Sequence, residues 1–429
     1  MHELSQMIKD DMKPALGVTE PGAIAFAVAK ARSFTKGDIK KVNVAMNSGM
    51  YKNAFTCGIP NSNEVGNVFA AALGVVAGNA DKGLESLADV TPEDNVKAQE
   101  MIDQGKITVE LSGITSRIFI EATVETEEDK AIVTIRDSHT NITKIIVNDK
   151  VELETEDEKK TEEDGGEEEA HSIHKYTLQQ LYDYVTTVDI EEIRFINEAY
   201  KVNLELFHEG LENPRTTFAR QLLAINNGKE VSDDEQKTAS LMCNAAIEAR
   251  VIGLDKPAMS ITGSGAHGII ATMPLYAAYK VNGYTEEQLL RATALSYLVC
   301  MYIKEYSGRL SAFCGCAIAA GSGMACALVY LRGGTVEMMA HTLNNMASSI
   351  TGMICDGGNQ GCTMKGVAAV DAAYKSVEFA MNGIYISEVH GINGNTPEET
   401  MRNMGLIASP GMVGTEKTIV EIFEDKLKK

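Results

Sequence analysis

Two cysteines flank a short glycine-rich loop in the C-terminal half of the chain. The stretch TGMICDGGNQGCTMK, residues 351–365, places Cys355 and Cys362 seven residues apart around glycine, asparagine and aspartate. These intervening residues suit a close approach of the backbone rather than packing in a core. The spacing therefore favours a ligand site, although two thiolates alone do not complete the coordination sphere of a metal.

A third thiolate is available in the preceding stretch RLSAFCGCAIAAGSGMAC, residues 309–326, which contains Cys314, Cys316 and Cys326. Cys314 directly precedes a long run of small residues with helical character, and the amides at a helix start favour an anionic group. Cys326 falls well inside that run, where we expect it to pack in the core. Cys314 is therefore the preferred partner of the loop cysteines.

Three thiolates that leave one position open are the arrangement expected of an iron–sulfur cluster that binds its substrate. Soft thiolate donors select zinc or iron–sulfur clusters. Zinc held by three cysteines and a histidine, for which His267 is a candidate, is the alternative. The spacing alone leaves both open.

A second group of candidates consists of polar loops. ITGSGAHGIIATMPL places Ser264, Gly265 and His267 in a turn that opens an apolar helix. The free backbone N–H groups of such a turn could receive a carboxylate. The alternative is an ordinary capped helix start.

RDSHTNIT groups four polar residues between two predicted strands, Ser138, His139, Thr140 and Asn141. A single histidine there is more often a satisfied turn residue than a catalyst. The TEP sequence at Thr19, Glu20 and Pro21 reads by itself as a helix N-cap. The chain has no P-loop, no GxGxxG after a strand and no GxSxG.

Hydrophobic periodicity predicts the elements that carry these residues. Helices are expected at residues 1–12, 19–31 and from 61, and strands at 39–51, 106–113, 117–126 and 131–149, with 106–113 and 117–126 forming a hairpin. From residue 177 onward almost every segment reads as helix. We expect an α+β fold: an N-terminal part, 1–150, with a mainly antiparallel sheet and helices, an acidic flexible loop at 151–175, and a mostly helical cluster-binding catalytic domain at 176–429.

The composition excludes several classes of function. The 429 residues carry a net charge of −21, and residues 151–169 alone hold eleven acidic residues and two lysines. Without a cationic surface, binding to the phosphate backbone of nucleic acid is not expected. The N-terminus has no signal-peptide core, and no apolar run reaches the roughly 20 residues of a membrane span. We therefore expect a cytoplasmic protein. Its eight cysteines are then not expected to form disulfides. The many small residues and the absence of tryptophan predict closely packed helices.

Taken together, the motifs resemble the L-cysteine desulfidase family, which is similar to the iron–sulfur L-serine dehydratases. The similarity runs almost end to end and consists of PALG-x-TEP, MYKN at residues 50–53, HTNI at 139–142, GSG-x-x-GI at 263–269, LSA-x-C at 310–314, and GMICDG with a following C-x-MK. GMICDG with its paired cysteine is the most specific of these.

The resemblance implies a [4Fe–4S] cluster held by Cys314, Cys355 and Cys362. It also implies a lyase reaction, the β-elimination of L-cysteine to sulfide and 2-aminoacrylate, which hydrolyses to pyruvate and ammonia. The iron without a protein ligand would act as a Lewis acid on the leaving group, a base would remove the Cα proton, and glycine-loop amides would hold the carboxylate. Pyridoxal phosphate is not needed.

The chain departs from the family pattern at three positions. The usual GCTEP contains the proposed proton acceptor, but this chain has Val18 there, and valine accepts no proton. His267 stands where glutamine is usual, and Cys57 in FTCGIP is not expected from the pattern. We therefore expect His267, or else Cys57, to be the base, because histidine is readily neutral and basic at physiological pH.

Three functions follow from this pattern. The leading one is an iron–sulfur lyase of amino-acid catabolism that acts on L-cysteine, and the second is a dehydratase of L-serine or a related amino acid. Because of Val18, a catalytically inactive iron–sulfur sensor is the third. A small amino acid is the expected partner, with no nucleic acid or membrane, and the apolar helical half makes a homodimer plausible.

Overall fold

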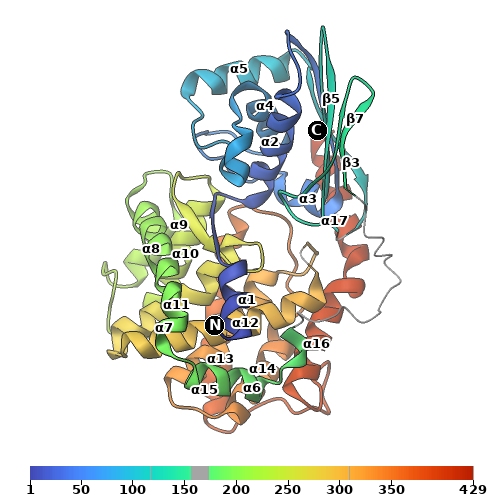
Figure 1. Cartoon of the computed structure of the whole chain (residues 1–429). Helices are drawn as coiled ribbons and strands as arrows, with labels where there is room; N and C mark the ends of the chain where they lie inside the picture. The colour runs from blue at the N-terminus through green and yellow to red at the C-terminus, as the bar shows by residue number, and fades with distance from the viewer. Residues whose placement is uncertain (116, 156–172, 309, 429) are drawn as a thin grey trace. The chain divides into compact units, whose positions relative to one another are not determined.

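The computed structural model describes residues 1–115, 117–155, 173–308 and 310–428, and the chain forms two compact units (Figure 1). The helical unit comprises Met1–Ala15, Ile173–Cys355 and Gln360–Met412. The sheet unit comprises Leu16–Ser172, Asp356–Asn359 and Val413–Lys429. This confirms the α+β class. The grouping differs from the predicted boundaries, because both ends of the chain and the four residues 356–359 join the unit that the sequence order does not suggest.

The sheet unit is built on a six-stranded mixed sheet with the order β3-β2-β4-β5-β6-β7. Its strands are β2 (Ile39–Asn47), β3 (Ile107–Gly113), β4 (Phe119–Thr126), β5 (Lys130–Arg136), β6 (Ile142–Val147) and β7 (Lys150–Glu154). Only the β2–β3 pair is parallel. The predicted hairpin of β3 and β4 is therefore wrong, since β2 lies between these two strands.

The core of the sheet unit lies between one face of the sheet and its helices. The helices are α2 (Thr19–Arg32), α3 (Ser48–Ala54), α4 (Asn67–Ala77), α5 (Pro92–Asp103) and α17 (Val413–Leu427). Figure 1 shows α2 and α4 against the strands, where alternate strand residues are buried: Val42, Val44, Met46, Ile120, Ala122, Val124, Val133 and Ile135. Alternation of side chains along each strand gives the sheet this apolar face.

Two predicted boundaries in this unit are corrected. The expected strand at 39–51 ends at Asn47, whose side chain donates to Thr115 O at 2.9 Å, and a helix follows it directly. The helix expected from residue 61 begins at Asn67. Its N-cap is Gly66, whose φ of 96° is readily adopted only by glycine.

The helical unit consists of closely packed helices and a two-stranded sheet of β1 (Lys13–Leu16) and β8 (Pro257–Ser260). The helices are α1 (Glu3–Asp11), α6 (Leu178–Thr187), α7 (Ile190–Ile193), α8 (Asn197–Glu212), α9 (Phe218–Ile225), α10 (Glu235–Val251), α11 (Gly265–Asn282), α12 (Glu286–Ser307), α13 (Gly321–Leu331), α14 (Val336–Ile350), α15 (Gly361–Met381) and α16 (Pro397–Leu406). A β-carbon on Gly323 would lie 2.2 Å from Ser296 O, so α13 and α12 pack closely through glycine as expected.

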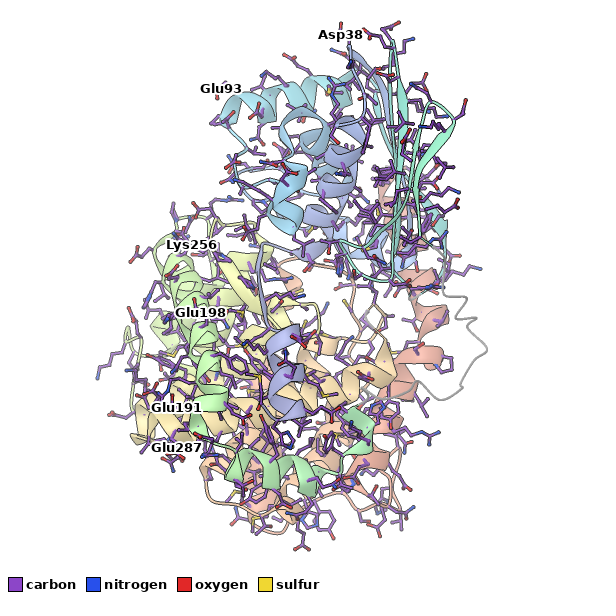
Figure 2. All side chains as sticks on the ribbon, viewed as in Figure 1. Asp38, Glu93, Glu191, Glu198, Lys256 and Glu287 are labelled. Carbon is purple, nitrogen blue, oxygen red and sulfur yellow. The ribbon has the colours of Figure 1, made fainter. Side chains whose placement is uncertain are left out.

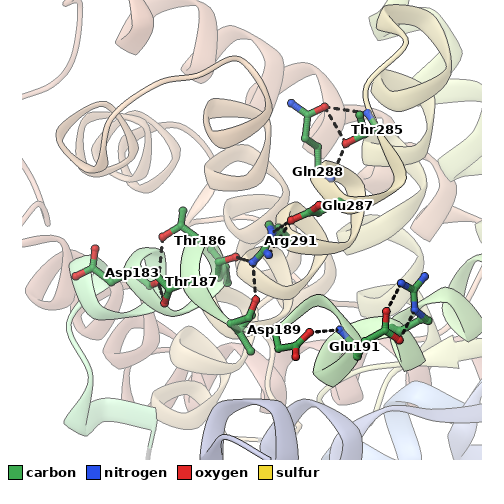
Figure 3. Close-up of polar contacts among 12 residues, drawn as sticks. Asp183, Thr186, Thr187, Asp189, Glu191, Thr285, Glu287, Gln288 and Arg291 are labelled. Carbon is green, nitrogen blue, oxygen red and sulfur yellow. Dashed lines mark hydrogen bonds and ion pairs between the residues drawn. The ribbon is translucent and has the colours of Figure 1, made fainter.

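Polar contacts fix the start of α12, the helix that carries two of the residues discussed below (Figure 3). Thr285 and Gln288 form a capping box, in which each side chain accepts from the backbone N–H of the other. Arg291 donates to the carbonyl oxygens of Val185 and Val188 at 2.6 and 3.0 Å. These bonds hold α12 against the C-terminal end of α6.

The predicted acidic loop is described only at its two ends. Residues 150–154 form the exposed strand β7, and Ile173 is buried at the start of a short 3-10 turn. Residues 156–172 of the predicted loop lie outside the described residues. Elsewhere, acidic side chains such as Asp38, Glu93 and Glu198 project from the ribbon (Figure 2). Within the described ranges, no helix is long and apolar enough to span a bilayer.

Candidate active site

Cys314 and Cys355 are brought together in the helical unit by a short backbone pairing. The N–H of Cys314 donates to Met353 O at 3.0 Å, and the N–H of Cys355 donates to Ala312 O at 2.6 Å. The two segments therefore run antiparallel around an isolated bridge. Because side chains alternate along such segments, both cysteines lie on one side of this pairing. Two of the three predicted cluster cysteines are thus neighbours, although 41 positions separate them.

Lys304 of α12 lies among the thiols and was not among the residues predicted from the sequence. Its side chain is buried, and burial lowers the pKa of Lys304. Cys300, Cys316, Cys355 and Cys314 oppose that shift and raise the pKa, which places all four thiols within electrostatic reach of the ammonium group. The signal that the sequence offered is Lys304 at the end of the apolar run Leu298–Ile303 in α12.

The first turn of α15 approaches the same thiols. The pKa of Cys314 is held well above its usual value, first by a hydrogen bond with Cys316 and then by burial, while the charge of Lys365 opposes the shift. Cys362 precedes Lys365 by three positions on α15, a spacing that places both on one side of the helix. The third predicted cysteine, Cys362, therefore shares the first turn of α15 with a lysine whose charge reaches Cys314.

His267 packs against the residue between Cys314 and Cys316. Its Nδ1 lies 2.5 Å from the hydroxyl oxygen of Thr262. A β-carbon on Gly315 would lie 2.8 Å from the Nε2 atom of His267. Burial, and then the positive charges of Lys304 and Arg250, lower the pKa of His267 well below its usual range. The imidazole is therefore neutral at physiological pH.

The donor chemistry of the three predicted cysteines fits an iron–sulfur group, because thiolates are soft donors, and two of the three lie on adjoining segments. No three His, Cys, Asp or Glu side chains within the described ranges converge closely enough to hold a metal ion. None of the eight cysteines, all of which lie in the described ranges, forms a disulfide. Cys326 is buried in α13, where burial raises its pKa to about 12, as expected of a packing residue.

The sheet unit gathers a second set of predicted residues around Glu20. The Oε1 atom of Glu20 accepts from the Nδ2 of Asn53 at 2.9 Å and lies 3.8 Å from the Nε2 of His139. His139 is buried, and its Nε2 has no hydrogen-bond partner within the described part of the chain. Asn141 instead donates to Arg136 O within its own turn, and Thr140 is exposed. Only His139 of the predicted HTN group is directed inward with Glu20.

The loop at residues 356–359 joins this set. The N–H of Gly358 donates to Asn53 O at 3.0 Å, and a β-carbon on Gly357 would lie 2.5 Å from Lys52 O. The buried ammonium of Lys52 pairs with Glu416 at 3.0 Å. Val18 faces the same loop, because a β-carbon on Gly358 would lie 2.8 Å from its Cγ1. A cysteine at position 18 would have faced this loop, and valine fills the place with methyl groups.

The predicted residues thus divide between the two units. The helical unit contains Ser264, Gly265, His267, Cys314, Cys355 and Cys362, and the sheet unit contains Thr19, Glu20, Cys57, Ser138, His139, Thr140 and Asn141. Cys57 is buried, with its thiol 3.5 Å from Ala54 O, and it belongs to a different unit from His267. Sequence reasoning missed Lys304 and Arg250, and it quoted Lys52 and Asn53 only as part of the MYKN motif, without a role.

The structure is that of an α+β protein, and all of its cysteines except Cys57 lie in the helical unit. Residues 81–421 match the model of the serine dehydratase alpha chain, so the chain belongs to the serine dehydratase alpha chain family. A UPF0597 protein of Clostridium botulinum is 40% identical over 98% of both chains. UPF0597 proteins of Caldanaerobacter subterraneus and Bacteroides fragilis are 37% and 34% identical, each over 99% of this chain and 98% of its own length.

Proposed function

We propose that the protein is an iron–sulfur-dependent lyase that catalyses β-elimination of a small amino acid, with L-cysteine as the first candidate substrate. The observation that carries this proposal is the backbone pairing that brings Cys314 and Cys355 together, with the buried Lys304 within electrostatic reach of both. Membership of the serine dehydratase alpha chain family supports the same reaction class. The free cysteines suit the reducing conditions of a cytoplasm.

Cys314, Cys355 and Cys362 are the residues proposed to hold a [4Fe–4S] cluster. When bound, that group supplies Lewis-acid chemistry at the β-heteroatom of the substrate. The positive charge of Lys304 stabilises thiolates in a buried setting, where an unpaired thiolate is costly. The chain thereby provides a cation for the negative charge that three deprotonated thiols introduce.

His267 is the proposed acceptor of the Cα proton. Its low pKa keeps the imidazole neutral and able to accept a proton, and the contact of Nδ1 with Thr262 orients the ring. In the elimination, the Cα–H electrons form the double bond and the Cβ–S bond breaks, so that sulfide and 2-aminoacrylate leave. 2-Aminoacrylate then takes up water and yields pyruvate and ammonia. With L-serine the same electron flow would expel hydroxide.

A cluster-binding sensor without catalysis is the second candidate, and one observation favours it. Val18, where the resembling family has its proton acceptor, is buried and packs against Gly358. If this position is where the base must lie, Val18→Cys should create or strongly raise sulfide release. If His267 is the base, Val18→Cys should leave turnover unchanged and His267→Gln should abolish it.

The test is an anaerobic assay of the chain reconstituted with iron and sulfide. Sulfide and pyruvate from L-cysteine are expected, at a higher kcat/KM than pyruvate from L-serine. Pyruvate from L-serine alone identifies a dehydratase. A cluster with neither product supports the sensor, and a preparation that retains zinc but no iron contradicts the proposal.

A further inference from the structure

Arg250, near the C-terminal end of α10, is a buried cation without a counterion among the described residues. Only 4% of its surface is exposed. Its Nε has no hydrogen-bond partner, and no carboxylate in the described ranges lies within ion-pair distance of its guanidinium. A buried charge without a partner is costly, and proteins retain one where a ligand supplies the missing charge.

Two neighbouring acids are turned away from this cation. Glu248, two positions earlier on α10, accepts from the backbone N–H groups of Thr217, Phe218 and Ala219 at 2.8, 3.1 and 2.8 Å. Asp11, whose negative charge acts to raise the pKa of His267, accepts a hydrogen bond from the backbone N–H of Thr262. Among the described residues, the charged groups that shift the pKa of His267 are two cations, Lys304 and Arg250, and the acid Asp11, which already accepts a hydrogen bond.

The guanidinium of Arg250 lies directly against the N-terminal turn of α11. A β-carbon on Gly265 would lie 2.7 Å from the Nε of Arg250 and 3.2 Å from its Cδ. Helix α11 has eighteen residues, and its N-cap Ser264 makes no side-chain hydrogen bond to the first turn. The guanidinium therefore lies beside the start of a long helix, whose first-turn N–H groups receive no side-chain cap and whose end carries partial positive charge.

We propose that Arg250 and the first turn of α11 form a binding site for a carboxylate, the α-carboxylate of the amino-acid substrate. This identification of the ligand rests on the proposed function, whereas the anion site rests on Arg250 alone. A guanidinium presents two parallel N–H donors that match a carboxylate, and backbone N–H groups complete the shell. Gly265 is required here because any side chain would displace the guanidinium. His267, two positions further along α11, would then lie next to the bound amino acid.

The ligand-free protein provides the first part of the test, with Arg250→Gln as the variant and Arg332→Gln as the matched control. Arg332 is paired with Glu235 of the same helix α10 at 3.2 Å. Because Arg250 has no partner to lose, Arg250→Gln should unfold at the same urea concentration as the wild type or at a higher one. Arg332→Gln should unfold at a lower one. A clear loss of stability in Arg250→Gln would identify a structural arginine and overturn the proposal.

The second part measures binding to the reconstituted full chain by calorimetry under anaerobic conditions. L-Alanine has the carboxylate but no leaving group, and L-alaninamide lacks the carboxylate. The wild type and Arg332→Gln should bind L-alanine, and Arg250→Gln should bind it about 10- to 100-fold more weakly, the range for losing a hydrogen bond to a charged group. L-Alaninamide should bind weakly to all three.

Equal affinity of wild type and Arg250→Gln for L-alanine contradicts the carboxylate site, as does failure of the wild type to bind it. Sulfide release from L-cysteine, measured on the same wild-type preparation, separates the two proposals. Arg250-dependent binding without turnover contradicts only the proposed lyase function. Turnover that Arg250→Gln leaves unchanged contradicts only the role of Arg250.

Discussion

Replacing Gly315 by alanine tests the packing of His267 and Lys304 against the thiol segment. The added β-carbon would lie 2.8 Å from the Nε2 of His267 and 3.2 Å from the Cδ of Lys304. Gly315 has helical angles, φ −55° and ψ −32°, so alanine brings no backbone strain and gains about 0.5–1 kcal/mol in conformational entropy. Overpacking a buried site costs about 1–3 kcal/mol. The net loss in the free energy of unfolding is therefore about 0–2.5 kcal/mol.

Urea unfolding of the ligand-free chain measures this loss, and iron content after anaerobic reconstitution measures its effect on the site. Gly352→Ala is the control, because a β-carbon there meets nothing within 4 Å and lies in the same stretch as Cys355. We expect the control to match or exceed the wild type in stability and to retain its iron. If Gly315→Ala is as stable as Gly352→Ala and holds as much iron, His267 and Lys304 do not pack against Gly315 as described.

Three further predictions concern the cluster, a buried ion pair and a histidine. Cys314→Ser should lose most of its bound iron after reconstitution, whereas Cys326→Ala should retain it; equal iron in the two variants would contradict the thiol assignment. Lys52→Met should lower the free energy of unfolding by about 3–5 kcal/mol, because it leaves the buried carboxylate of Glu416 without its ion-pair partner. The double variant Lys52→Met, Glu416→Leu should recover most of that loss, and a double variant whose loss equals the sum of the two single losses would refute this interpretation. Burial lowers the pKa of His174 in the folded chain. Below about pH 6.5 this histidine is therefore protonated more fully in the unfolded chain than in the folded one, and the free energy of unfolding should fall as the pH drops. The slope from His174, whose ring is only half-buried, should stay below about 1.4 kcal/mol per pH unit and disappear in His174→Asn, as followed by urea midpoints between pH 5 and pH 7.

Local sequence patterns predicted the fold class and most elements, because hydrophobic periodicity and capping act over short distances. Thr19 to Ala31 reads as helix and is one, and the strands between residues 106 and 149 lie where alternation placed them, whereas β7 occupies the start of the predicted acidic loop. Strand order was not predictable in this way. Residues 106–113 and 117–126 look like a hairpin, yet both pair with β2, because the sheet buries its apolar face against α2 and α4.

The sequence predicted which residues of the candidate site could do chemistry, but not which of them lie together in the fold. The motifs around Cys314 and Cys355 identified the thiols, and the pairing that unites them involves backbone atoms that any residue possesses. Lys304 and Arg250 were not singled out from the sequence, because charged residues in helices are usually exposed. Their burial results from helix packing that no local pattern records.

Mössbauer spectroscopy of the chain reconstituted anaerobically with ⁵⁷Fe tests the central proposal most directly. A cluster held by Cys314, Cys355 and Cys362 leaves one iron without a protein ligand, so L-cysteine should shift the signal of one iron site and leave the others unchanged. Spectra that contain no cluster, or cluster spectra in which L-cysteine shifts the signal of no iron site, would contradict the proposed lyase.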